Sequence, residues 1–407
     1  MPARIVIAAT LDTKGREAGL VRDYIAARGH EPVVVDTGVL GTPAIPAEIP
    51  RQEVARAAGT SLDELVRAAD RGGAIETMAR GLAALVQRLH AEGRLDGILG
   101  IGGSAGTAIG TAAMRALPVG VPKVMVSTMA SGDTRPYVGT KDITMMYSVV
   151  DVAGINRLSR RILANAAGAI CGMVEAREAG APTGEEKPLI AATMFGVTTP
   201  CVTRARELLE ANGFEVLVFH ATGTGGQAME GLIEDGFIAG VLDITTTEWA
   251  DELVGGVLSA GPHRLEAAGR KGIPQVVSVG ALDMVNFGPP ETVPEKFRGR
   301  KFYQHNPQVT LMRTTVEENR ELGRIIAEKL NQATGPTALY LPLRGVSLYD
   351  TDDGPFVDEA ARAALFEAIR THLDRSKVKL VEMDVAINDP PFAEAMAREL
   401  MAMLGRA

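Results

Sequence analysis

A glycine-rich stretch, Gly100–Thr107, follows a short apolar run of the sequence and precedes a segment of small residues. Glycine has no Cβ atom, so backbone N–H groups in such a loop can approach an anion closely. A helix that begins there adds unpaired N–H donors and partial positive charge. We therefore predict a phosphate-binding loop made of Gly102, Gly103, Ser104, Ala105, Gly106 and Thr107.

The pattern of this loop differs from two common phosphate-binding motifs. It satisfies G-x-G-x-x-A at positions 100–105, but it does not follow the first strand of the chain. The Lys-Ser/Thr pair of a Walker loop does not follow it either. A tight turn that lets a helix pack closely on a strand would need the same glycines, and this alternative stays open.

A second polar loop, Thr10–Gly15, follows the first apolar run. Asp12 or Thr13 would serve as a helix N-cap. Lys14 would then lie near a helix N-terminus, where the helix dipole disfavours a cation. A bound phosphate would remove that conflict and leave Asp12 for a ribose hydroxyl or Mg²⁺, whereas a solvated surface lysine is the alternative.

Further polar residues follow the second apolar run and the segment after it. Asp36 is placed to bind a ribose hydroxyl, with Thr37 beside it, and Arg71 with Gly72 opens a helix-like stretch that could meet a phosphate. Between them, residues 41–72 form an insertion without a strand pattern, partly helical from Leu62. Insertions of this length often line a site.

The second half of the chain also carries polar residues after its apolar runs. We take four of them as candidate acid–base groups: His220, Asp243, Glu248 and His305. His220 opens a second glycine-rich loop that ends at Gly226. No named catalytic motif joins these residues, and we predict no metal site. Cys201 lies near a helix start that could lower its pKa, although a buried, inert thiol is the favoured interpretation.

Composition limits the remaining function classes. The formal net charge of −8 over 407 residues argues against a partner such as nucleic acid or an anionic membrane. Two cysteines cannot build a disulfide framework and fit a reducing cytoplasm. The sequence has no apolar run near the roughly 20 residues that a membrane-spanning helix needs. We expect a cytoplasmic protein.

The elements that must position these loops alternate as short apolar runs and amphipathic stretches, as in parallel sheets covered by helices on both faces. The predicted strands of the first half are 5–10, 32–36, 97–101 and 124–128, with helices at 15–28, 73–92, 107–116 and 154–177. The rhythm returns at 189–193, 215–219, 239–244 and 273–278, followed by two more strand–helix units after residue 331. We predict an α/β protein of two doubly wound, mainly parallel subdomains, residues 1–180 and 187–407.

Several blocks together resemble a known family, which comprises bacterial and fungal proteins and the ATP-binding N-terminal domain of the tomato mosaic virus resistance protein. The blocks run in order over essentially the whole chain: Thr10–Gly15, Gly100–Thr107, Val121–Gly132, Tyr147–Asn156, His220–Gly226 and Phe302–Thr315. This resemblance implies two Rossmann-like subdomains, a homodimer, and ATP held by the first subdomain. The implied contacts are Asp12, Thr13, Lys14, Arg71 or Gly72, Gly103, Ser104, Ala105 and Gly106. Plant members have Gly where this chain has Ala105, and Ala still permits close backbone approach.

Three hypotheses follow for function. The first is a cytoplasmic protein that binds ATP, with or without Mg²⁺, through the loops Asp12–Lys14 and Gly102–Thr107. The second is an enzyme that acts on a small metabolite in an interdomain cleft. The third is a non-catalytic sensor or interaction module that responds to a nucleotide. Whether ATP is hydrolysed is not decided by the sequence.

Overall fold

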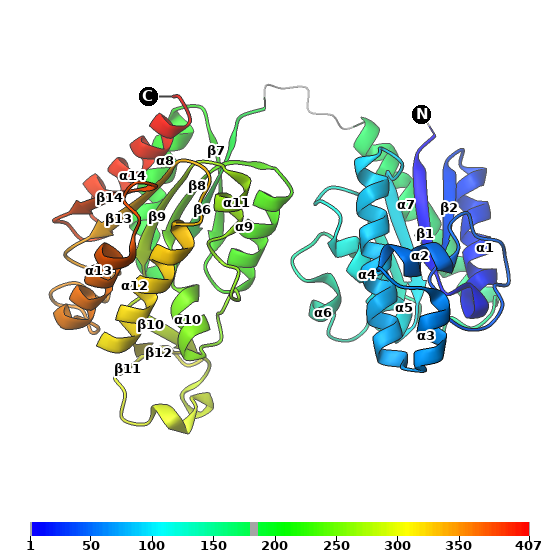
Figure 1. Ribbon diagram of the computed structural model, residues 1–407, viewed down its shortest axis with the longest axis horizontal. Helices are drawn as coiled ribbons and strands as arrows, with labels where there is room; N and C mark the ends of the chain where they lie inside the picture. Colours follow the sequence, from blue (N-terminus) through cyan, green and yellow to red (C-terminus); the bar gives the residue numbers. More distant parts are fainter. Residues whose placement is uncertain (1, 180–185, 407) are drawn as a thin grey trace. The chain divides into compact units, whose positions relative to one another are not determined.

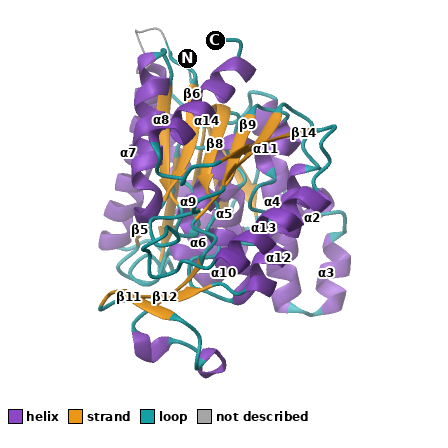
Figure 2. Cartoon of the chain, turned by 90° about the vertical axis from the view of Figure 1, so that its left-hand side faces the viewer, coloured by secondary structure: helices purple, strands orange, loops and turns teal. Residues whose placement is uncertain are grey.

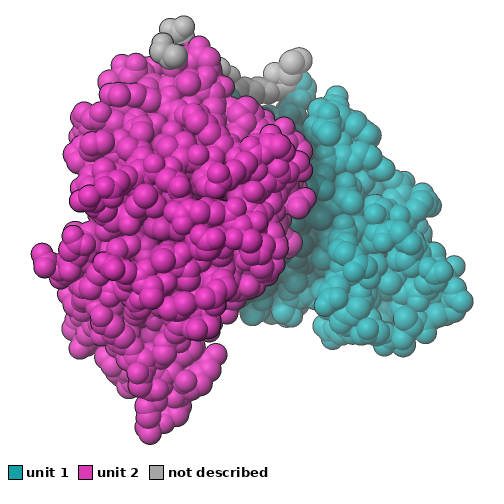
Figure 3. Space-filling view, turned by 60° about the vertical axis from the view of Figure 1, so that its left-hand side comes forward, with its two compact units in different colours: residues 1–184 teal, residues 185–407 magenta. Residues whose placement is uncertain are grey.

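The computed structural model describes residues 2–179 and 186–406. The chain divides into two compact units, residues 1–184 and 185–407 (Figure 3). The subdomain boundary expected near residues 179–187 lies largely outside the described residues. Each unit has its own sheet and its own core, and the two are described in turn.

The first unit, mostly blue and cyan in Figure 1, is built on a five-stranded parallel sheet. Its strand order is β2-β1-β3-β4-β5. Its strands are β1 (Arg4–Ala9), β2 (Glu31–Asp36), β3 (Gly97–Gly102), β4 (Lys123–Ser127) and β5 (Thr144–Tyr147). Its helices are α1 (Leu11–Ala27), α2 (Arg51–Ala57), α3 (Leu62–Ala68), α4 (Arg71–Ala91), α5 (Ser104–Arg115), α6 (Arg135–Val138) and α7 (Arg157–Ala179).

Helices cover both faces of this sheet. Alternate strand residues point to opposite faces, so Ile5 and Ile7 pack with α1 and α7. Val6 and Ala8 face the other way, into a core with α4 and α5. The continuous apolar runs that predicted the strands exist because both faces are buried.

The second unit is built on a six-stranded parallel sheet with the order β14-β13-β9-β8-β6-β7. Its strands are β6 (Leu189–Met194), β7 (Glu215–His220), β8 (Ile238–Thr245), β9 (Gln275–Gly280), β13 (Thr337–Pro342) and β14 (Val378–Met383). Its α-helices are α8 (Thr199–Ala211), α9 (Thr224–Glu234), α10 (Glu248–Val254), α11 (Ala267–Lys271), α12 (Val316–Leu330), α13 (Glu359–His372) and α14 (Pro390–Met403). Its short 3₁₀ helices are η1 (Gly196–Thr198), η2 (Pro290–Thr292) and η3 (Glu295–Phe297).

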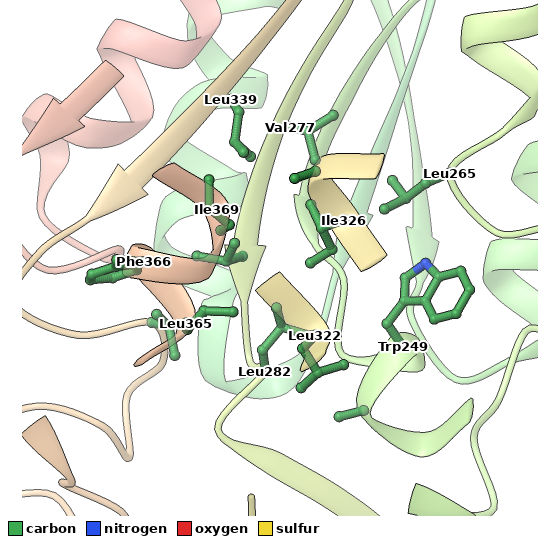
Figure 4. Close-up of a cluster of buried hydrophobic side chains, with 14 of the residues drawn as sticks. Trp249, Leu265, Val277, Leu282, Leu322, Ile326, Leu339, Leu365, Phe366 and Ile369 are labelled. Carbon is green, nitrogen blue, oxygen red and sulfur yellow. The ribbon is translucent and has the colours of Figure 1, made fainter. Parts of the chain in front are cut away.

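The largest core of this unit lies between the sheet and helices α12 and α13. Figure 4 shows Ile326 of α12 near Val277 of β9 and Leu322 of α12 near Leu282, with Ile369 of α13 in the same cluster. Helices α8 and α14 bury the opposite face of the sheet.

The two sheets share one topology. Read from its β7 edge, the second sheet runs β7-β6-β8-β9-β13, which repeats the order β2-β1-β3-β4-β5 of the first. The prediction of two doubly wound α/β units of similar topology is confirmed.

The structure also contains elements that the sequence did not predict. A small antiparallel sheet of order β10-β12-β11 is formed by β10 (Met284–Phe287), β11 (Phe302–Asn306) and β12 (Val309–Arg313) (Figure 2). Strand β5 was also not predicted, and the insertion contains a helix, α2, before the expected one, α3. Helix α1 begins at Leu11, four residues before its expected start.

Candidate functional site

A pocket of about 580 Å³ lies at the carboxyl ends of β1, β2 and β3. The connection after β1 runs to β2 and the connection after β3 runs the opposite way to β4, and such switch points are where α/β sheets bind ligands. Most of the loop residues predicted from the sequence line this pocket: Asp12, Thr13, Lys14, Thr37, Arg71, Gly103, Ser104, Ala105 and Gly106.

Besides Asp36, which is described below, three residues predicted for the same site are not in its lining. The Gly72 amide donates to Asp70 Oδ1 at 3.0 Å, which caps α4. A Cβ atom on Gly102 would lie 2.6 Å from Gly106 Cα, so this glycine lets α5 pack against the end of β3. Thr107 is buried and shares a 2.6 Å hydrogen bond with Ser127. These three residues shape the loops behind the pocket wall.

Part of the pocket lining is polar and favours an anion. Helices α1 and α5 both begin there, and neither N-cap residue, Thr10 or Gly103, forms a side-chain cap hydrogen bond. Lys14 is half-buried in the first turn of α1. Neither Lys14 nor Arg71 forms an ion pair with any residue that the structure describes. Two helix N-termini and two unpaired cations thus surround one space.

The rest of the pocket lining is apolar. It consists of Val39, Leu40, Leu65, Val66, Ala74, Ile75, Met78 and Ile109, of which Leu65 and Val66 come from the insertion. Leu40 is 65% exposed and Val66 44% exposed. Apolar side chains at such exposure, next to a polar cavity, suit the face of a planar organic group.

The acid at the end of β2 is engaged in the fold. Asp36 pairs with Arg51 at 2.8 Å and also accepts hydrogen bonds from the amides of Leu11 and Gly38. Because both of its oxygens are used, these contacts favour a structural role over the ribose contact that the sequence suggested. Asp12 is half-buried in the pocket lining, which also contains the carboxylate of Asp70, the acceptor for the Gly72 amide.

The two acids nominated in the second unit are also engaged. Asp243 and Glu248 are buried and both bind the guanidinium of Arg264, with closest distances of 2.5 and 2.7 Å. Arg264 is buried as well and carries no recognisable signal in the sequence. These ion pairs favour a structural role for both acids over acid–base catalysis.

The two candidate histidines lie on different strands with different neighbours. His220 ends β7, is exposed, and has its ring 5.7 Å from that of Phe195. His305 is exposed on β11, and its Nδ1 lies 3.0 Å from the hydroxyl of Tyr349. Tyr349 also stacks on Tyr303, with ring centroids 4.8 Å apart. The sequence did not single out either tyrosine.

Cysteine and metal chemistry have little support in the described residues. Burial raises the pKa of Cys201 to about 12, which agrees with the interpretation of an inert thiol. Within residues 2–179 and 186–406, no group of three or more His, Cys, Asp or Glu residues could hold a metal ion. No helix of these segments is long and apolar enough to cross a membrane.

The fold and the pocket define a two-unit α/β protein with a cavity at the carboxyl edge of its first parallel sheet. The chain belongs to the Uncharacterised protein family (UPF0261): residues 3–179 match the model of its N-terminal domain and residues 187–404 that of its C-terminal domain. The resemblance inferred from the sequence blocks is thereby confirmed.

The relatives are similar over most or all of this chain. A UPF0261 protein of Clostridium tetani is 57% identical over 405 residues, covering 99% of this chain and 100% of that protein. The ToMV resistance protein Tm-1(GCR237) of Solanum lycopersicum is 47% identical over 334 residues, or 80% of this chain. That match covers 44% of the tomato protein, so less than half of its length has a counterpart here.

Solved structures add little. The glycosyltransferase SnogD from Streptomyces nogalater aligns over 99% of this chain and 100% of its own, with 13% identity and a TM-score of 0.21. A similarity at this level supports no inference about function.

Proposed function

We propose that this protein binds ATP in the pocket at the carboxyl ends of β1, β2 and β3. The observation that carries this proposal is the mixed lining of the pocket, which contains the cations Lys14 and Arg71 and the starts of α1 and α5 together with exposed apolar side chains. A nucleoside triphosphate combines the same two characters, a polyanion and a largely apolar base. The volume of about 580 Å³ falls inside the range of roughly 300–1,000 Å³ usual for small-molecule sites.

The polar part of the pocket lining fits a polyphosphate. Backbone N–H groups at the start of a helix are unpaired unless something caps them, and the N-terminus carries about half a positive charge. At the start of α1 the Leu11 amide donates to Asp36 Oδ1 and the amides of Thr13 and Lys14 donate to the Thr10 carbonyl oxygen, which leaves the Asp12 amide for a phosphate oxygen. The amides at the start of α5, from Ser104 on, are the other donors that a phosphate could use. Lys14 and Arg71 supply full charges for the same group.

The apolar part of the pocket lining fits a nucleobase. Leu40, just before the insertion, and Val66, within it, bring exposed apolar surface to the pocket. A base placed between them and Ile75 would remove that surface from water, which stabilises the complex by roughly 25 cal/mol per Å². Asp12 is the acid available to a ribose hydroxyl or to Mg²⁺ carried by the phosphates.

Calorimetric titration with ATP and Mg²⁺ tests the proposal on the full-length protein. We expect saturable binding for the wild type and affinity roughly 10- to 100-fold weaker for Lys14→Ala, because one charge-assisted hydrogen bond contributes about 1.5–3 kcal/mol. Ser104→Ala should weaken binding less, since a neutral hydroxyl is lost. Absence of binding heat in the wild type, or equal affinity of wild type and both variants, would remove the proposal.

A further inference from the structure

The second unit has strands that correspond to those around the pocket of the first. Strands β6, β7 and β8 occupy in their sheet the places of β1, β2 and β3. The helix that follows the third strand begins with Ser104 in the first unit and with Glu248 in the second. A glycine-rich loop, Gly223–Gly226, leads from β7 into α9 at this same edge.

The side chain of Glu248 binds this glycine loop from inside the protein. Its Oε1 accepts hydrogen bonds from the amide of Gly223 at 2.8 Å and from the amide of Gly226 at 3.0 Å. Residue Glu248 is 1% exposed. A Cβ atom on Gly226 would lie 2.2 Å from Glu248 Oε2, so only glycine allows the carboxylate to come this close.

The other carboxylate oxygen is fixed by a buried cation. Arg264 Nε donates to Glu248 Oε2 at 2.7 Å, while the two Nη atoms of Arg264 bind Asp243. Glu230 also pairs with Arg264, at 3.3 Å, and accepts from the amide of Leu265. Three carboxylates therefore share one guanidinium, and this surplus of acidic groups repels any further anion.

We infer that Glu248 is a built-in anion for the glycine loop of the second unit. Its carboxylate takes the two amide donors that a phosphate would use, and it is a positioning residue that fixes the first turn of α9 against α10. The loop Gly223–Gly226 has the residues of a phosphate-binding loop, yet it is closed and takes no phosphate. The apparent second ligand loop is thus part of the framework of the second unit.

Hydrogen exchange of backbone amides on the full-length protein tests this inference, with inorganic phosphate as the probe. In the wild type we expect the amides of Gly223 and Gly226 to exchange slowly and to keep the same rates when phosphate is added. Phosphate-dependent slowing at either amide would show that an external anion displaces Glu248 and would overturn the inference.

A substitution supplies the second arm. In Glu248→Gln the amide keeps the size of the side chain, but its NH₂ group faces the guanidinium of Arg264 or the two glycine amides. We expect faster exchange at Gly223 and Gly226 and a fall in Tm on the order of 10 °C, because breaking a buried ion pair strongly destabilises a protein. Exchange rates and Tm equal to those of the wild type would overturn the inference.

Glu252→Gln is the matched control, since Glu252 lies on the same helix and binds Ser259 instead of the loop. It should leave the exchange of Gly223 and Gly226 unchanged. If Glu248→Gln yields no folded protein, the wild-type phosphate experiment still decides the matter. Both arms report on the second unit, so a failure of ATP binding in the first would not alter their outcome.

Discussion

The carboxylate of Asp36 and the guanidinium of Arg51 form an ion pair of 2.8 Å, with side chains only 2% and 6% exposed. The pair joins the end of β2 to the start of α2 in the insertion. Arg51 also donates to the Leu40 carbonyl oxygen at 2.7 Å, and Asp36 accepts from the amide of Leu11. One buried ion pair therefore holds three segments of the pocket wall in place.

Arg51→Met should destabilise the protein strongly, because it leaves the buried charge of Asp36 without a partner. Removing one partner of a buried ion pair costs about 3–5 kcal/mol. Urea unfolding would show a lower midpoint than in the wild type. The double variant Asp36→Asn/Arg51→Met removes both charges and should recover part of the loss; a double variant less stable than Arg51→Met would contradict this account.

The charge of Lys14 should make ATP binding depend on salt. Exposed electrostatic attraction is screened at higher ionic strength, so the affinity ratio of wild type to Lys14→Ala should shrink as salt rises. Titrations at low and high salt measure this ratio. Arg16→Ala is the control, since Arg16 is an exposed cation two residues further along α1. An equally large effect of Arg16→Ala would mean that general charge, and not the pocket, attracts the ligand.

Substitutions in the apolar part of the pocket lining should respond differently to salt. Leu40→Ser and Val66→Ser should each weaken ATP binding by about 3- to 10-fold, because each removes apolar surface that the base would bury. Their effect should be nearly the same at all salt concentrations. Adenosine should compete less well for the pocket in these two variants, and Lys14→Ala should change its competition little. The reverse pattern would mean that the base lies near Lys14 and not near Leu40 and Val66.

Asp283 gives the second unit a pH-dependent stability. Burial raises the pKa of Asp283 to about 7, with a further contribution from the nearby carboxylate of Asp350. The unfolded chain loses this proton near pH 4, so between about pH 4 and 7 the folded state holds a proton that the unfolded state has released. The free energy of unfolding should therefore fall as the pH rises through this window and stay low above it.

Asp283→Asn removes that titration while keeping the side-chain size. Relative to the wild type, the variant should gain stability between pH 5 and pH 8, by an amount on the order of a few kcal/mol. Denaturant unfolding at both pH values measures the difference. Asp384→Asn is the control, because Asp384 is exposed and Arg344 lowers its pKa. An Asp283→Asn effect that is identical at both pH values would contradict the raised pKa.

The parallel sheets were predictable because burial on both faces leaves a mark in the sequence. Runs such as Ile5–Ala9 and Leu189–Ala192 are apolar at every position, and helices separate such runs along the chain. Strand β5 was not predicted because it is a short edge strand whose first and last residues, Thr144 and Tyr147, are exposed. Strand β11 is exposed along its whole length, so it has no apolar pattern to recognise.

The pocket loops were predictable for a different reason. Glycines and hydroxyl residues directly after a strand identify the edge where ligands bind, and most of those named in the first unit meet in one cavity. The roles of Asp36, Asp243 and Glu248 were not predictable, because each depends on an arginine elsewhere in the chain. Arg51 and Arg264 look like ordinary surface residues in the sequence, and only folding buries them.

Lys14 has a consequence for the protein without ligand. A cation in the first turn of α1 opposes the helix dipole, which costs about 0.3–1 kcal/mol, and no ion pair with a described residue relieves it. This position is a point of local frustration, where folding alone would prefer a neutral or acidic residue. Selection of random variants for heat resistance alone should therefore favour replacement of Lys14, and under the proposed function the selected proteins would be more stable but would bind ATP less tightly.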